Sequence, residues 1–466
     1  MRQLTTADAA FYYMERPRTP SHVLPVFFYD PSTAPGGRVT FDDLLLHLSH
    51  RVHHARTLRE RLVPVPFELD RPYWIEDDNF DLEFHVRQIA VPRPGRWEDV
   101  MTLVGRLHSR PLDLTRPPWE LYMVEGVSAS DRTGPDGFAV VMKVHHAAID
   151  GVAGLELLNV VHSTTPDVEA LGPAPALHGE PVPSSWDLLA RSALNTMATP
   201  ARFATALRRS PPVRELRHLL RDARSNLRPP VLPPPTRFSG NVSAHRVVDS
   251  VEWPLDEVKR SKRAVDGATV NDVALAIVSG ALRSYLEDKG ELPSRPLTAM
   301  VPISVRVGDA GAGGNQISSM VVPIATHVAD PVERLALITE TTRGEKARRD
   351  GVDVRSQTEL SEALPGALLG LGMRAAARFT GRVPLANTLV TNVPGSPTAL
   401  YLCGAKAVAQ TGGGPLTDGM GVINIVGSYC GSFVVSVNAC REMMPDPAFY
   451  IDCVRRSHED LLAAAG

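Results

Sequence analysis

One stretch of this chain places two adjacent histidines directly after an apolar run. The stretch reads Lys143-Val144-His145-His146-Ala147-Ala148-Ile149-Asp150-Gly151-Val152-Ala153-Gly154. The residues from Phe138 to Val144 are apolar apart from Lys143, and such a run is typical of a strand buried on both faces. We therefore expect a buried strand that ends on the histidines, then a short turn, and then a helix from Gly154 to Val161.

The histidines and the carboxylate after this strand are suited to general acid–base chemistry. A hydroxyl is a weak nucleophile at neutral pH, and a neutral imidazole with a pKa near about 6.5 can take its proton as the oxygen attacks. Asp150 lies four residues after His146, on the same side if the turn is helical. A single histidine at a strand end is more often a core residue. Two adjacent histidines followed by Asp-Gly at this offset arise by chance in roughly one such chain in several hundred, which favours a functional site.

The remaining sequence alternates strand and helix patterns in two halves separated by a proline-rich stretch. Strand patterns cover residues 24–29, 119–124, 245–253, 297–305, 319–325, 387–393, 423–429 and 432–437. Helix patterns cover residues 97–109 and 269–286, and another begins near Trp186. This alternation predicts a mixed α/β protein with an N-terminal domain over 1–165, a helical Pro- and Arg-rich linker over 166–240, and a C-terminal domain over 241–466.

The bulk composition is that of an average soluble globular protein. Apolar residues make up 43% and charged residues 22% of the 466 positions, and the formal net charge is −3. No global basic field therefore argues for nucleic acid as a partner. The four cysteines form no Cys-x-x-Cys pair, which predicts no metal site and a reducing compartment. Because no apolar window reaches about 18 residues and the first residues lack a signal-peptide pattern, we expect a cytoplasmic protein with at most peripheral membrane contact.

The motif His145-His146-x-x-x-Asp150-Gly151 resembles the signature of the coenzyme A-dependent acyltransferase superfamily. Further segments resemble one branch of it, the bacterial wax ester synthase/diacylglycerol acyltransferase family. These segments are Leu4-Thr5-Thr6-Ala7-Asp8-Ala9-Ala10-Phe11 with Glu15, Ser21-His22-Val23, His85-Val86-Arg87, Pro111-Leu112-Asp113, Arg116-Pro117-Pro118-Trp119-Glu120, Thr269-Val270-Asn271-Asp272, Pro302-Ile303-Ser304-Val305-Arg306, Gly314-Asn315-Gln316 and Thr391-Asn392-Val393-Pro394-Gly395. The resemblance covers nearly the whole chain, and the order of the motifs is its specific part.

The resemblance implies two chloramphenicol-acetyltransferase-like domains joined by the linker, with a tunnel between them. Acyl-CoA would enter from one side and a diacylglycerol or a long-chain alcohol from the other, and the two would meet at His146. His146 would be the general base of a direct transfer without an acyl-enzyme, so acyl-CoA is a substrate and no cofactor is expected. The product would be triacylglycerol or a wax ester, and a lipid acceptor implies peripheral contact with an anionic membrane or a lipid droplet.

The other residues of the motif are expected to support His146. His145 is expected to hold the turn. For Asp150, the resemblance favours a structural ion pair over a role in orienting the base. Gly151, like Gly154, lets a backbone or a substrate approach closely because it has no side chain.

Three polar residues outside the motif are further candidates. Thr269 and Asp272 have the spacing of a helix capping box, which explains Asp272 without a functional role. Asn271 has no such explanation, and the resemblance places it near the active site. Asn315 and Gln316 belong either to a turn or to a polar lining of the tunnel.

Two segments have simpler interpretations. The run Gly412-Gly413-Gly414 lacks the Lys and Ser/Thr of a phosphate loop and is interpreted as a mobile connection. From residue 202 to residue 228 the linker has eight arginines against two acidic residues, an excess of six positive charges. A solvated charged helix explains this excess as well as a surface that docks on anionic lipid does.

Two other functions stay open at this point. A condensation-type acyltransferase would use the same fold and base but take its acyl group from a carrier protein, and no carrier-like serine motif is present. A non-catalytic lipid-binding homologue would be free to lose His146, so the intact motif argues against it.

Overall fold

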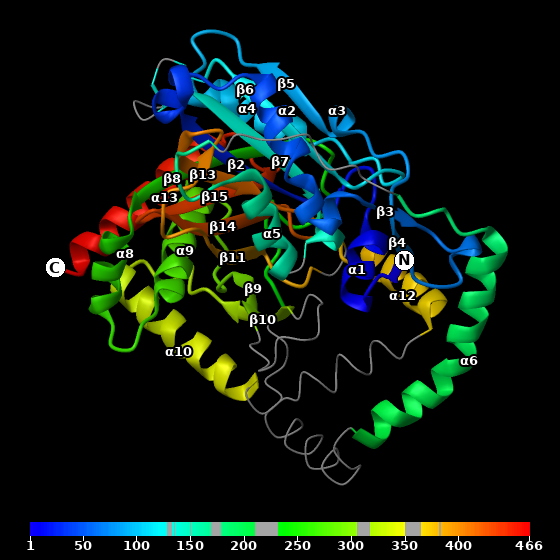
Figure 1. Ribbon diagram of the computed structural model, residues 1–466. Coiled ribbons are helices and arrows are strands. Elements are labelled where there is room, and N and C mark those ends of the chain that lie inside the picture. Colours follow the sequence, from blue (N-terminus) through cyan, green and yellow to red (C-terminus); the bar gives the residue numbers. More distant parts are fainter. Residues whose placement is uncertain are drawn as a thin grey trace.

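The computed structural model describes residues 1–127, 133–134, 136–149, 151–168, 179–209, 232–304, 317–349, 365–381 and 384–466. Within these ranges the strands form two six-stranded sheets and one three-stranded sheet. Helices surround the two large sheets (Figure 1). The predicted mixed α/β class with two domains is confirmed.

The first large sheet holds the strand that carries the two histidines. Its strands follow the order β12-β13-β2-β7-β6-β5. They span Tyr401–Leu402 (β12), Ala405–Gly413 (β13), His22–Asp30 (β2), Phe138–His145 (β7), Trp119–Glu125 (β6) and Val86–Ala90 (β5). Neighbouring strands are antiparallel except for β5 and β6, which are parallel. Every residue of β7 is buried, as its apolar run predicted, so this strand is a rigid mount for the two histidines at its end.

The second large sheet is mixed as well. Its strands follow the order β10-β9-β11-β14-β15-β8. They span Ile317–Pro323 (β10), Thr298–Ser304 (β9), Thr388–Pro394 (β11), Val422–Tyr429 (β14), Ser432–Cys440 (β15) and Arg246–Pro254 (β8). β11 runs parallel to both of its neighbours, and the other pairs are antiparallel. The predicted hairpin between β14 and β15 is confirmed, since Tyr429 pairs with Ser432 across a two-residue turn.

The second half of the chain contributes two strands to the first large sheet. β12 and β13 come from the second half, yet β13 pairs with β2 and completes the first sheet. A boundary drawn at residue 241 therefore separates these strands from the sheet to which they belong. The domain limits at 165/166 and 240/241 stay predictions, and the pairing of β13 with β2 shows that the two halves share backbone hydrogen bonds.

The helices cover both sheets. They span Thr6–Met14 (α1), Phe41–Ser49 (α2), Leu82–His85 (α3), Trp97–His108 (α4), Gly151–Val161 (α5), Ser185–Arg209 (α6), Leu255–Ser261 (α8), Val270–Asp288 (α9), Pro331–Arg349 (α10), Gly366–Phe379 (α12) and Pro447–Ala464 (α13). The small sheet has the order β1-β4-β3, with strands Arg2–Gln3, Tyr73–Glu76 and Glu60–Val63. α6 extends away from the body along one side of the molecule (Figure 1). The predicted linker helix near Trp186 is confirmed.

The predicted capping box at the start of α9 is present. The Thr269 hydroxyl accepts a hydrogen bond from the Asp272 backbone N–H, and the Asp272 carboxylate accepts one from the Thr269 backbone N–H. The second oxygen of Asp272 accepts a hydrogen bond from the Thr342 hydroxyl at 2.7 Å. Asp272 therefore has all its partners within the fold and a structural role.

The interpretation of the glycine run as a mobile connection is wrong. Gly412 and Gly413 are the last residues of β13 and pair with Pro25 and Leu24 of β2. A Cβ atom at Gly412 would lie 2.9 Å from the Leu24 carbonyl oxygen, and one at Gly413 would lie 3.2 Å from the His108 ring. These positions are glycine because the neighbouring strand and helix leave no room for a side chain.

Candidate active site

The two histidines lie where strand β7 ends and a short turn begins. A 3-10 turn over His146–Ala148 follows β7, and α5 begins at Gly151. The strand, turn and helix predicted for this stretch are therefore confirmed. Across the pair of strands β2 and β7, His145 is the register partner of His22.

His145 is fully buried, and hydrogen bonds occupy both of its ring nitrogens. Its Nδ1 accepts a hydrogen bond from the Ala147 backbone N–H at 3.1 Å, so the proton of the neutral ring lies on Nε2. Nε2 is 3.1 Å from the Glu15 carboxylate, to which it donates. With both nitrogens engaged, His145 has no lone pair left for a substrate and is positioned to hold the turn.

His146 is placed differently. Its ring stacks on the Phe11 ring, with centroids 3.8 Å apart and planes 11° apart, and its backbone N–H donates to the Ser21 carbonyl at 2.7 Å. Among the described residues no group hydrogen-bonds its Nδ1, which is buried. The side chain is half-buried, so part of the ring remains open to a ligand.

Burial lowers the pKa of His146 to about 4, and the nearby His145 acts in the same direction. The ring is therefore uncharged at neutral pH, because a group with a depressed pKa gains its proton only when the pH falls to that value. An uncharged imidazole has a free lone pair, which is the form that accepts a proton from a hydroxyl.

The sequence did not single out Glu15 or Phe11 as parts of the site. Glu15 is 130 positions from His145, and it also accepts a hydrogen bond from the Ser21 backbone N–H at 3.1 Å. One carboxylate thus fixes the buried histidine and the segment whose carbonyl holds His146. The signal that could have found both residues is their place in the opening segment, which resembles the family but is far from the motif.

A buried carboxylate of the second half ties this opening segment down. The Asp418 side chain is 4% exposed and forms ion pairs with Arg18 at 2.7 Å and with Arg16 at 3.3 Å. Its other oxygen accepts a hydrogen bond from the Val242 backbone N–H. The segment that touches both histidines is therefore anchored on one side to the second half of the chain.

Behind His145 lies a second buried group of imidazoles. His22 Nε2 is 2.9 Å from His108 Nδ1, and His108 Nε2 is 2.9 Å from the Asn438 amide nitrogen. Burial holds the pKa of His22 well below its usual range and lowers that of His108 to about 3. This group joins β2 and α4 of the first half of the chain to β15 of the second half. Its imidazoles are uncharged at neutral pH.

The structure leaves several predicted site residues undecided. Asp150, Asn315 and Gln316 lie outside the described residues. Gly151 is the first residue of α5. Asn271 is half-buried in the first turn of α9, and no hydrogen bond joins its side chain to either histidine. The structure therefore brings His145 and His146 together with Glu15 and Phe11, and the roles of the other residues stay predictions.

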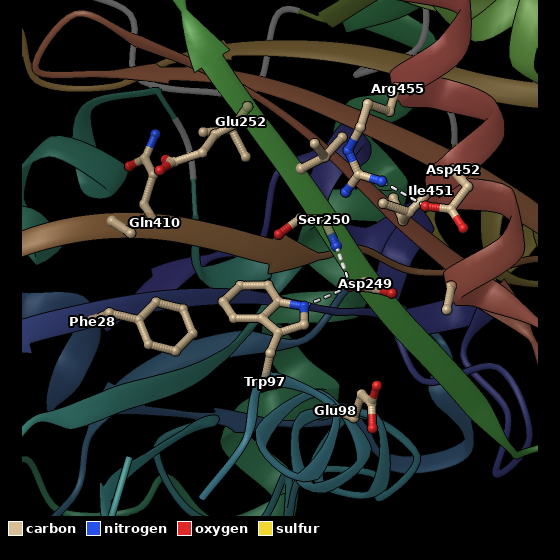
Figure 2. A pocket seen from close by; sticks show the side chains of 14 residues that line it. Phe28, Trp97, Glu98, Asp249, Ser250, Glu252, Gln410, Ile451, Asp452 and Arg455 are labelled. Carbon is tan, nitrogen blue, oxygen red and sulfur yellow. Dashed lines mark hydrogen bonds and ion pairs between the residues drawn. The ribbon is translucent and has the colours of Figure 1, made fainter. Parts of the chain in front are cut away.

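A cavity of about 380 Å³ lies away from the histidines. It is lined by residues of β2, α4, β8, β13, β15 and α13, and Figure 2 shows Trp97, Asp249 and Arg455 around it. The Trp97 indole N–H donates to the Asp249 carboxylate at 2.7 Å. Burial raises the pKa of Asp249. Phe28 lines this cavity near one end of β2, whereas His22 begins the strand, so the cavity is distinct from the motif.

Two features are absent from the described ranges. No group of three or more His, Cys, Asp or Glu side chains there is arranged to hold a metal ion. No helix in the same ranges is both long enough and apolar enough to cross a membrane.

Comparison with known proteins identifies the family. Residues 4–274 match the wax ester synthase/diacylglycerol acyltransferase catalytic domain, and residues 313–461 match the WS/DGAT C-terminal domain. Two Mycobacterium tuberculosis proteins named diacylglycerol O-acyltransferases are each 33% identical to the chain. One aligns over 451 residues, 96% of this chain and 87% of the relative, and the other over 474 residues, 100% and 98%.

Solved structures show the same fold at lower identity. The match to the wax ester synthase/diacylglycerol acyltransferase of Marinobacter aquaeolei VT8 covers 100% of each chain, with a TM-score of 0.69 and 24% identity. The starter condensation domain of rhizomide synthetase, with C8-CoA bound, has a TM-score of 0.56 and 14% identity, and the match covers 100% of this chain and 94% of that one. From the two family models and the full-length relatives, the chain belongs to the wax ester synthase/diacylglycerol acyltransferase family.

Proposed function

We propose that this protein transfers a long-chain fatty acyl group from acyl-CoA to the hydroxyl of a diacylglycerol, and also to a long-chain alcohol, with His146 as the general base. The observation that carries the proposal is the state of His146. Its imidazole is half-buried, uncharged at neutral pH and without a hydrogen-bond partner on Nδ1 among the described residues. Family membership supports the choice of substrates.

In the proposed reaction the imidazole takes the proton of the acceptor hydroxyl as the oxygen attacks the thioester carbonyl. The tetrahedral oxyanion then collapses, the carbon–sulfur bond breaks, and the coenzyme A thiolate leaves. The imidazolium returns the proton to that thiolate, so the enzyme ends as it began. The step needs no cofactor and no oxidant.

A direct transfer is favoured over a cysteine-bound intermediate by the state of the thiols. Burial raises the pKa of Cys403 to about 12 and raises that of Cys453, so both thiols stay protonated, and the thiolate is the nucleophilic form. Cys440 is buried. Cys430 is exposed at the turn between β14 and β15 of the second large sheet, whereas β7 belongs to the first.

The remaining residues receive supporting roles in this proposal. His145 holds the turn through Glu15, which the hydrogen bonds of both its nitrogens support. Asp150 forms a structural ion pair, and Gly151 leaves space beside the base. Asn271 supports the site near the base, and Asn315 and Gln316 bind substrate.

The proposed acceptor is a lipid, so the proposal includes peripheral contact with a membrane or lipid droplet inside the cell. The arginine-rich segment 202–228 is one candidate for this contact, and its residues from 210 onward lie outside the described ranges. Each basic residue near an anionic surface contributes about 1 kcal/mol, so a few would hold the protein at the surface.

The test is a competition between acceptors. Purified protein is incubated with palmitoyl-CoA and equal amounts of a diacylglycerol and hexadecanol, and the esters are identified by mass spectrometry. Triacylglycerol, with or without wax ester, supports the proposal. In a parallel incubation with a palmitoyl carrier protein as the donor, ester formed only there would instead indicate the condensation-type reaction, and no ester from either donor would indicate a non-catalytic homologue.

A further inference from the structure

The helix α6 presents an apolar face to water. Its inward contacts come from Leu188, Ser192 and Asn195, at helical spacing, and two of these three are polar. The opposite face follows the spacing i, i+4, i+7, i+11 and consists of exposed apolar residues, namely Trp186, Ala190, Ala193 and Met197. Trp186 is 81% exposed and Met197 is 78% exposed. A surface helix normally buries its apolar face against the protein, whereas α6 exposes its apolar face to solvent.

A neighbouring turn exposes a further aromatic ring. The 3-10 turn η5 spans Pro66–Glu68, and its Phe67 is 88% exposed at φ 57°, followed by Glu68 at φ 55°. Two successive residues with side chains in the left-handed region are unfavourable, and here that backbone displays a phenylalanine to solvent. Leu69, directly after the turn, is 44% exposed.

The helix α12 adds two leucines. Leu368 and Leu371 are 62% and 65% exposed, while Leu369 of the same helix is buried. Arg374 of α12 forms an ion pair with Glu68 of η5. α12 is therefore fastened beside the turn that displays Phe67.

These three elements meet at one carboxylate. The Asn195 amide of α6 donates to Asp70 at 2.8 Å, and the first residue of α12, Gly366, packs against Asp70 so closely that a Cβ atom would clash. Asp70 lies two residues beyond the turn η5. The three elements that carry these exposed side chains are thus joined at Asp70, and we call the exposed apolar side chains together the apolar platform (Phe67, Leu69, Trp186, Leu194, Met197, Leu368 and Leu371).

We propose that the apolar platform docks on an anionic phospholipid interface. Charge complementarity favours this occupant: α12 carries Arg378 and no acidic residue, besides Arg374, which pairs with Glu68, and α6 carries Arg191 against Asp187, with Arg202, Arg208 and Arg209 later in its sequence. Exposed apolar residues on helices with an excess of basic residues are the pattern of segments that lie in the membrane interface. This inference rests on the proposed lipid acceptor, and it places the contact on the helices α6 and α12, the first of which includes the beginning of the segment 202–228.

The platform adjoins the helix that carries Phe11. A Cβ atom at Gly370 of α12 would lie 3.2 Å from the Tyr13 ring of α1, and the Tyr13 hydroxyl donates a hydrogen bond to the Asp70 carbonyl. Two residues earlier in α1, Phe11 stacks on the ring of His146. A membrane-borne acceptor released at the platform would therefore enter beside the helix that covers the proposed base.

Tryptophan fluorescence tests the docking directly. Of the five tryptophans, Trp74 and Trp119 are buried, Trp97 and Trp253 are half-buried, and Trp186 is exposed. We expect vesicles of brominated phosphatidylglycerol to quench part of the emission of the full-length protein, and the Trp186→Phe variant to lose that quenching. Quenching that is unchanged in Trp186→Phe, or absent in the wild type, would overturn the assignment.

A second measurement separates docking from catalysis. The triple variant Leu194→Gln, Met197→Gln, Leu371→Gln should sediment with phosphatidylglycerol vesicles at least tenfold less than the wild type, and Thr196→Gln, at an exposed polar position of α6, is the matched control. On a water-soluble short-chain alcohol and acyl-CoA, the triple variant should keep wild-type turnover. Absence of any ester from the wild type with palmitoyl-CoA and either diacylglycerol or hexadecanol would refute the proposed function and leave the docking result standing.

Three outcomes would overturn the lipid proposal. They are equal sedimentation of the triple variant and the wild type, equal binding of the wild type to phosphatidylcholine and phosphatidylglycerol vesicles, and a wild-type dimer in solution that the triple variant converts to monomer. The last outcome would assign the platform to a second copy of the chain.

Discussion

The ring of Phe11 lies flat on the ring of His146, with centroids 3.8 Å apart, although 135 positions separate the two residues in the chain. The contact covers one face of the imidazole with an apolar surface and so contributes to the burial that lowers its pKa to about 4. The same contact fixes the plane of the ring, since stacked aromatic rings resist tilting. Phe11 is therefore a positioning residue for the proposed base.

Replacing His146 by alanine should abolish most of the transfer activity. General base catalysis contributes roughly 10² to 10⁴ in rate, so we expect turnover with palmitoyl-CoA and diacylglycerol to fall by that factor. The melting temperature should change little, because the side chain is half-buried and hydrogen-bonds to no described residue through Nδ1. A variant with more than half of the wild-type turnover would remove His146 from the mechanism.

Removing the Phe11 ring should move the pH dependence of the reaction. In Phe11→Ala, water reaches the imidazole, and the pKa of His146 should rise from about 4 toward the ordinary value near about 6.5. Because the neutral form is the active base, the acidic limb of the kcat/KM profile should move to higher pH. Phe11→Leu keeps an apolar cover and should move the limb less. Identical limbs in wild type and Phe11→Ala would show that the stack does not set this pKa.

Glu15→Ala should reduce both stability and rate. It leaves the Nε2–H of fully buried His145 without an acceptor, which costs about 1–3 kcal/mol in the free energy of unfolding. It also releases the Ser21 backbone N–H, and the carbonyl of Ser21 holds His146. Glu15→Gln keeps one acceptor oxygen and can accept from only one of these two N–H groups, so we expect effects on stability and rate between those of the wild type and Glu15→Ala. Urea unfolding and steady-state kinetics on one preparation of each variant check this, and a slow enzyme of wild-type stability would contradict the structural role of His145.

Lowering the pH should reduce the free energy of unfolding, and this fall should begin at pH values well above those at which carboxylates titrate. Burial lowers the pKa of His47 and His162 to about 4 and that of His108 to about 3, whereas each titrates near about 6.5 when unfolded. Below pH 6.5 the unfolded state binds protons that the native state does not. Each histidine then lowers the free energy of unfolding by about 1.4 kcal/mol per pH unit until its folded pKa is reached.

Urea midpoints measured at pH 7, 6 and 5 should therefore fall progressively. His47→Gln keeps a donor for the Val161 carbonyl, which His47 Nε2 contacts at 3.0 Å, and it should flatten the pH dependence by about one proton. A midpoint that stays constant from pH 7 to pH 5 would contradict the neutral, buried state of these rings.

The sequence by itself determined the elements and the location of the motif. The apolar run before His145 predicted a strand buried along its whole length, and the structure has β7 there. Thr269 and Asp272 predicted the start of α9 and its capping box. Such features could be predicted because they depend on residues within a few positions of one another, where backbone geometry and side-chain size decide the outcome.

The tertiary structure decided how the halves join and which groups surround the base. The glycines at 412 and 413 look like a flexible connection in sequence, and only the contacts with Leu24 and His108 show that they complete the first sheet. Likewise, no local pattern pairs Glu15 with His145 or Phe11 with His146. These contacts form because folding buries distant apolar and polar groups together, and a buried imidazole needs a partner or an apolar cover wherever in the chain it comes from.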